Sequence, residues 1–145
     1  MPTRTARTAW SGTLEKGSGR VELTSSGVGA YDVSFPKRAA DDAGGTTSPE
    51  ELIAAAHSSC YAMQFSALAA EAGGVPRRLD VTADVSLGPD PAGGFRLTGI
   101  TLTVRGEVDG LDADAFRKVA EQAKAGCPVS KALTGVEITL DAAPG

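Results

Sequence analysis

The first third of the chain alternates apolar and polar residues in short runs, a period typical of half-buried strands. These runs cover residues 3–10, 20–24 and 31–35, and the turn-like segment EKGSGR separates the first two. A polar, glycine-rich stretch, KRAADDAGGTTS, comes after the third run. The pattern therefore predicts three short strands followed by a loop.

The most apolar stretch of the chain follows the segment SPEE, which is a typical helix start. Ser48 can cap this helix, Pro49 takes the first helical position, and Glu51 completes a capping box. Gly73 and Pro76 predict its end. Residues three and four apart define one face, which consists of Leu52, Ala56, Cys60, Met63, Ala67 and Ala70. Because most other positions are also apolar or small, we expect a central helix covered on several sides.

Strand-like alternation returns over residues 79–87 and 95–104, and the turn-rich segment between them predicts an antiparallel hairpin. An amphipathic helix is expected over residues 112–125, with Asp112 as its cap. A short helix beginning at Pro128 and a last strand complete the chain. The order β-β-β-α-β-β-α-α-β predicts an α+β fold with helices packed on a largely antiparallel sheet.

The length and composition fit a single domain spanning residues 1–145. Hydrophobic residues make up 41% of the chain and charged residues 22%, which is typical of a globular protein. The net charge is −4 and no basic stripe is present, so nucleic acid is not an expected partner. The sequence contains neither a secretory signal pattern nor an apolar run of membrane-spanning length. We therefore expect a cytoplasmic protein without a membrane partner.

The two cysteines of the chain, Cys60 and Cys127, are the candidates for chemistry. Structural disulfides are rare in a reducing compartment, so these residues are expected to be free, catalytic or redox-sensing, or simply buried small side chains. Cys60 lies in the middle of the predicted long helix, where the dipole of that helix does not favour a thiolate. Cys127 precedes Pro128 and is predicted to be the N-cap of the short helix, where backbone N–H groups favour a thiolate.

A zinc site is an alternative interpretation of the same residues. His57 and Cys60 lie three positions apart on the predicted helix, and Cys127 could supply a third ligand of a catalytic zinc. However, His57 is the single histidine of the chain, and no fourth ligand has a standard spacing. A histidine packed in the core is therefore the favoured interpretation, and no metal site is predicted.

Three segments, TSPEELIAAAHSSCYAM, AKAGCPVSKAL and VEITLDA, together resemble the osmotically inducible protein C family, which includes the organic hydroperoxide resistance proteins. The resemblance extends over essentially the whole chain, and His57 is more similar to the osmotically inducible branch. It implies an intertwined homodimer and a cysteine-based peroxidase of oxidative and osmotic stress defence, with no metal, flavin or haem cofactor. The implied substrates are organic hydroperoxides and, more weakly, hydrogen peroxide, and the implied reductant is a dithiol such as a lipoyl group.

The same resemblance implies a role for four residues. Cys60 corresponds to the peroxidatic thiolate, which becomes a sulfenic acid, and Cys127 to the resolving cysteine, which forms a disulfide with it. Arg38 corresponds to the arginine that stabilises the thiolate and the peroxide, and Glu50 to the glutamate that orients this arginine. Glu50 and Cys60 are separated by about 15 Å along the predicted helix. The Arg38–Glu50 pair therefore either bridges from a mobile loop or serves Cys60 of a partner chain.

Apolar side chains near the first cysteine are candidates for a substrate pocket, and they are Leu52, Ile53, Met63 and Phe65. An apolar lining favours alkyl hydroperoxides, because burial of the alkyl group adds binding energy. Packing in the core is the alternative for each of these side chains, and His57 either tunes the pocket or only packs. A non-catalytic binder of small apolar molecules is the main rival to the peroxidase, followed by a zinc hydrolase and a purely structural dimer.

Overall fold

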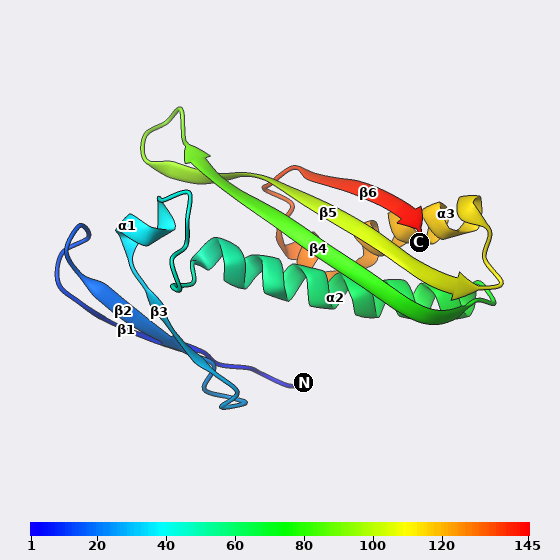
Figure 1. Ribbon diagram of the computed structural model, residues 1–145, viewed down its shortest axis with the longest axis horizontal. Coiled ribbons are helices and arrows are strands. Elements are labelled where there is room, and N and C mark those ends of the chain that lie inside the picture. The colour runs from blue at the N-terminus through cyan, green and yellow to red at the C-terminus, as the bar shows by residue number, and fades with distance from the viewer. The chain divides into compact units, whose positions relative to one another are not determined.

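The computed structural model describes residues 1–145 and contains two compact units, residues 1–52 and residues 53–145 (Figure 1). Both units combine strands and helices, so the predicted α+β class is confirmed. The strands form two separate three-stranded sheets, one in each unit, whereas the sequence suggested one sheet. That the whole chain acts as a single domain stays a prediction.

The first unit is built on an antiparallel sheet of three short strands, in the spatial order β1-β2-β3. Its strands are β1 (Arg7–Ser11), β2 (Ser18–Glu22) and β3 (Ala30–Val33). The third strand is followed by the short helix α1 (Phe35–Arg38), which the sequence analysis did not predict. The Ser34 side chain caps this helix by accepting a hydrogen bond from the Lys37 N–H. The segment SFP therefore starts a helical turn and ends the predicted strand early.

The long helix α2 (Pro49–Glu71) begins where the sequence predicts it. The Ser48 hydroxyl accepts a hydrogen bond from the Glu51 N–H at 3.1 Å, which confirms the predicted cap. The Glu51 carboxylate accepts a hydrogen bond from the Thr47 hydroxyl. The first turn of α2 belongs to the first unit, and the remainder belongs to the second.

The second unit contains a sheet in the order β4-β5-β6, in which β4 and β5 form the predicted antiparallel hairpin. Its strands are β4 (Val75–Pro89), β5 (Phe95–Asp109) and β6 (Ile138–Pro144). The helices α3 (Ala113–Gly126) and α4 (Pro128–Ala132) connect β5 to β6. Because β6 pairs with β5 in parallel, the chain needs such a crossover between these two strands. The Asp112 carboxylate caps α3 as predicted, by accepting a hydrogen bond from the Ala115 N–H.

The core of the second unit joins α2, α3 and the sheet. The α2 residues buried in this unit lie four positions apart, and they are His57, Tyr61, Phe65 and Ala69. Phe65 packs on Phe116 of α3 with 4.9 Å between the ring centroids. Leu102 and Val104 of β5 complete the contact.

The face of α2 that the sequence spacing suggested is not the buried one. Met63, which belongs to the suggested face, has 73% of its surface exposed. The orientation follows the aromatic side chains Tyr61 and Phe65, because they bury far more apolar area than alanines do. Within the second unit, one face of α2 is thus packed, and not several sides as expected. None of the helices combines the length and the apolarity that a bilayer crossing requires.

Candidate active site

The two cysteines lie next to each other in the second unit. Cys60 on α2 and Cys127, which precedes α4, are both unpaired thiols, and their Sγ atoms are 3.1 Å apart. This distance permits an S–H···S hydrogen bond and is about 1 Å longer than a disulfide bond. Cys127 is fully buried, whereas Cys60 keeps part of its surface exposed. The partly exposed Cys60 thiol therefore lies directly beside the buried Cys127 thiol.

The environment makes the two thiols unequal. Burial raises the pKa of Cys60, and the neighbouring Cys127 raises it further, although the Val129 N–H acts in the opposite direction. Burial also opposes the ionisation of Cys127, but the backbone N–H of Ser130, the Cys60 thiol, the Ser130 hydroxyl and the Val129 N–H together lower its pKa. Cys127 is therefore the more acidic thiol of this unit.

The start of α4 explains this difference. Cys127 is the N-cap of α4, as predicted, and Pro128 follows at the first helical position. Its Sγ atom lies near the unpaired N–H groups of the first turn, without a fully directed capping hydrogen bond. For Cys60, the sequence indicated only the dipole of its own helix as a local influence. The Val129 N–H of α4 also acts on this thiol and lowers its pKa, which no local pattern predicted.

His57 is buried in the same region, one helical turn before Cys60. Its Nε2 atom lies 2.7 Å from the Ser130 hydroxyl, and both side chains are buried. Its Nδ1 atom is buried without a hydrogen-bond partner. Burial lowers the pKa of His57, so the imidazole is neutral near pH 7. Sequence reasoning did not single out Ser130, because no local pattern links it to His57.

Arg38 and Glu50 form an ion pair within the first unit. The Arg38 Nη2 and Nε atoms donate to Glu50 Oε1 at 2.7 and 3.0 Å, and Nε is also 3.2 Å from Oε2. The Glu50 side chain is 10% exposed and the Arg38 side chain 32% exposed. The carboxylate thus fixes the guanidinium, while part of the Arg38 side chain remains exposed. The structure brings this predicted pair together and the two cysteines together, each within one unit.

A small apolar pocket lies beside Arg38 in the first unit. It has a volume of about 140 Å³, and its lining residues are Trp10, Leu14, Val33, Ser34, Phe35, Arg38 and Pro49. The sequence analysis did not propose any of these apolar side chains. The signal available in the sequence was the single tryptophan of the chain, which lies on a short strand.

The four residues predicted to line a substrate pocket do not lie together at one site. Phe65 is fully buried in the core of the second unit, so a substrate does not reach its side chain, and this assignment was wrong. Met63 is exposed on α2, and Leu52 and Ile53 are partly buried near the start of that helix.

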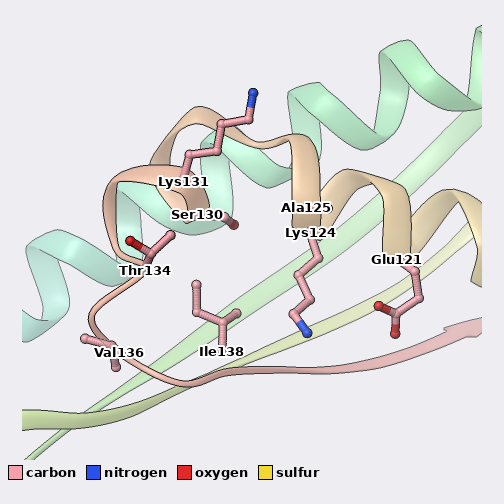
Figure 2. Close-up of a pocket in the computed structure, with 8 residues that line it drawn as sticks. All are labelled: Glu121, Lys124, Ala125, Ser130, Lys131, Thr134, Val136 and Ile138. Carbon is pink, nitrogen blue, oxygen red and sulfur yellow. The ribbon is translucent and has the colours of Figure 1, made fainter.

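A larger cavity of about 340 Å³ lies between α3, α4 and β6 of the second unit (Figure 2). Glu121 and Lys124 extend from α3 toward β6, whereas the amine of Lys131 points away from the cavity. Ser130 also borders this cavity, but its hydroxyl is bonded to His57 on α2. No group of three or more His, Cys, Asp or Glu side chains is arranged to hold a metal ion.

This α+β architecture, with a reachable and a buried thiol in contact, defines a candidate redox protein. A family model described as "OsmC-like protein" matches residues 41–141. The chain is 43% identical over 132 residues to the peroxiredoxin OsmC of Escherichia coli (strain K12), which covers 91% of this chain and 90% of that protein. This protein belongs to the OsmC-like family.

Two other similar proteins come from the organic hydroperoxide resistance branch. The organic hydroperoxide resistance protein OhrA of Bacillus subtilis (strain 168) is 38% identical over 99 residues, covering 67% of each chain. The crystal structure of an organic hydroperoxide resistance protein from Elizabethkingia anophelis has a TM-score of 0.80 and 27% identity, covering 100% of this chain and 98% of the other. Both branches of the resemblance found in the sequence are therefore represented among its relatives.

Proposed function

We propose that this protein is a thiol-dependent peroxidase that reduces organic hydroperoxides and, more weakly, hydrogen peroxide. The observation that carries the proposal is the 3.1 Å separation between Cys60 and Cys127. Cysteines that only pack in a core need not contact each other, whereas two cysteines that form a disulfide must approach closely. The relatives named peroxiredoxin and organic hydroperoxide resistance protein support the same activity.

In the first step, the Cys60 thiolate attacks one oxygen of the peroxide. The O–O bond breaks, Cys60 becomes a sulfenic acid, and the alkoxide leaves with a proton as the alcohol. Cys127 is the more acidic thiol, but it is fully buried and a substrate does not reach it. Exposure therefore assigns the attack to Cys60 and leaves the second step to Cys127.

In the second step, the Cys127 thiolate attacks the Sγ atom of the Cys60 sulfenic acid. The S–S bond forms, the S–O bond breaks, and the leaving hydroxide takes a proton to become water. A dithiol reductant, such as a lipoyl group, then restores both thiols by exchange and is itself oxidised to a disulfide. The partial exposure of Cys60 gives that reductant one sulfur to attack.

Arg38 and Glu50 supply the charge that this chemistry needs. Burial raises the pKa of Cys60, and no Lys or Arg of residues 53–145 offsets this effect. The partly exposed Arg38 side chain, held by Glu50, is suited to stabilise the thiolate and to donate to a peroxide oxygen. We assign these roles to Arg38 and Glu50, with the apolar pocket beside Arg38 as the place of the alkyl group.

A homodimer is part of the proposal. The exposed residues on the uncovered side of α2 are small or apolar, namely Ala55, Ala56, Ser59, Met63, Ala67 and Ala70. A second copy of the chain can cover this face, since small side chains permit close packing. The Arg38–Glu50 pair of one chain then serves Cys60 of its partner. A monomer that keeps full peroxidase activity at high dilution contradicts this part of the proposal.

The decisive experiment adds one equivalent of cumene hydroperoxide to the reduced protein and counts free thiols over time. Non-reducing peptide mapping then identifies the product. Rapid loss of both thiols with a Cys60–Cys127 linkage is the expected result. Survival of both thiols overturns the peroxidase and favours a binder of small apolar molecules, which takes up the ligand without thiol oxidation.

A further inference from the structure

His57 and Ser130 connect the core of the second unit to the buried thiol. His57 Nε2 and Ser130 Oγ are 2.7 Å apart, and Ser130 lies in the first turn of α4, three positions after its N-cap Cys127, where its hydroxyl and backbone N–H lower the pKa of that thiol. The three side chains come from α2, α4 and the residue before α4, and all are buried. We propose that His57 and Ser130 are positioning residues that hold Cys127 as a thiolate, aimed at Cys60, for the disulfide-forming step. This inference rests on the proposed function.

The free nitrogen of His57 sets the direction of the hydrogen bonds. If Ser130 donated to Nε2, the proton of the neutral ring would lie on Nδ1, and a buried N–H would have no acceptor. A buried N–H without an acceptor is rare in folded proteins, whereas an unused acceptor is tolerated more often. The His57 Nε2–H group therefore donates to Ser130 Oγ, and the Ser130 hydroxyl is free to donate to Cys127.

This direction makes His57 a hydrogen-bond donor and not a base. Burial lowers the pKa of His57, so the imidazolium that would result from taking the Cys127 proton is disfavoured. Two other titratable groups on α2 interact with Cys127: the Cys60 thiol lowers its pKa, and the pKa of the Tyr61 phenol is in turn raised by Cys127. Burial, Glu121 and Cys127 all raise the pKa of Tyr61, so its phenol stays neutral. The Ser130 hydroxyl is thus the side chain that carries a hydrogen bond from His57 to the thiolate.

The hydrogen bond from Ser130 to Cys127 affects one step of the reaction, the formation of the disulfide. Cys127 attacks only as a thiolate, and a hydroxyl that donates to it raises the thiolate fraction and fixes the direction of its lone pairs. Loss of the hydroxyl leaves the volume of the site nearly unchanged but removes this donor. Disulfide formation should then slow relative to the oxidation of Cys60, and its pH midpoint should rise.

The experiment follows one turnover by stopped flow at several pH values, with dimedone trapping of the sulfenic acid. We expect Ser130→Ala and His57→Leu to slow the second phase relative to the first by about ten-fold. Ser130→Thr and His57→Gln, which keep a donor at each position, should restore most of the rate. The matched control is Thr134→Val, which removes an exposed hydroxyl from the residues just after α4. A second phase with the wild-type rate and pH midpoint in both Ser130→Ala and His57→Leu overturns the proposal.

A separate measurement distinguishes failure of this inference from failure of the proposed function. In a Cys60→Ser background, the Cys127 thiolate is titrated by its ultraviolet absorbance, which requires no peroxide. Ser130→Ala should raise the pKa of Cys127 by about one unit in this background. An unchanged pKa contradicts the inference even if the peroxidase is active. A raised pKa supports it even if the wild-type protein does not consume peroxide.

Discussion

The Sγ atoms of Cys60 and Cys127 are 3.1 Å apart, although 67 positions separate the two residues in the sequence. A disulfide bond is about 2.05 Å long, so the sulfur atoms need to approach by only about 1 Å. Cys127 is held by α4, and Cys60 lies in the middle of the long helix α2. Disulfide formation therefore needs only a small local adjustment, because the fold already holds the Cys127 thiol beside Cys60.

The different exposure of the two thiols predicts different phenotypes for their serine variants. Cys60→Ser should abolish peroxide consumption, because no reachable thiol remains. Cys127→Ser should still reduce one equivalent of cumene hydroperoxide and leave a sulfenic acid at Cys60, detectable by dimedone and mass spectrometry. Reversed phenotypes would show that Cys127 is the residue that attacks.

The ion pair predicts a large effect of Arg38. Arg38→Met should lower the second-order rate constant of Cys60 oxidation by about 100-fold, since it removes the cation and its hydrogen-bond donors. Arg38→Lys should restore only part of the rate, because a lysine does not make the bidentate contact with Glu50. The rate constant of Glu50→Gln should lie between those of Arg38→Met and Arg38→Lys. Lys37→Met is the control on the same helix, and an equal loss in this variant would contradict a specific role of Arg38.

The apolar pocket beside Arg38 predicts a change in substrate preference. Leu14→Ser should lower kcat/KM for cumene hydroperoxide by about ten-fold, because it removes apolar contact with the alkyl group. The value for hydrogen peroxide should stay the same, since this substrate has no alkyl group. Val28→Ser is the control, because Val28 is 74% exposed and lies outside the pocket. Equal losses for both peroxides would exclude the pocket as the alkyl site.

Because Phe65 lies in the core, its truncation should destabilise the protein without changing its preference between peroxides. Phe65→Ala should lower the free energy of unfolding by about 3–5 kcal/mol in urea, because it leaves a cavity against Phe116. The ratio of kcat/KM between cumene hydroperoxide and hydrogen peroxide should not change in the folded fraction. If the variant kept wild-type stability but changed this ratio of kcat/KM values, Phe65 would be part of the substrate pocket.

Because His57 is buried, we expect the stability of the protein to depend on pH. Burial lowers its pKa below the usual 6.5, so the unfolded chain binds a proton more readily than the folded chain. Stability from this group is therefore complete above the unfolded pKa and is lost as the pH falls toward the folded pKa. The free energy of unfolding should decrease as the pH is lowered below about 6.5, before most carboxylates titrate. Since His57 is the single histidine, His57→Gln should remove this slope, and an unchanged slope would assign it to other groups.

The sequence by itself determined the features that depend on neighbouring residues. The cap at Ser48, the cap at Asp112 and the hairpin of β4 and β5 follow from local patterns, and all are found in the structure. Such signals act between residues a few positions apart, so they can be recognised without knowledge of the packing. The resemblance to the family added the pairs Cys60–Cys127 and Arg38–Glu50 as residues to examine.

Only the tertiary structure decided which side chains meet. The spacing of apolar residues on α2 was compatible with several faces, and the aromatic side chains selected the buried one. The contact of His57 with Ser130 spans 73 positions, and no local pattern encodes it. The same holds for the Val129 N–H that reaches Cys60 and for the pocket formed by Trp10 and Leu14. These relationships arise when distant segments pack together, because burial of the largest apolar surfaces fixes where the small polar groups finally lie.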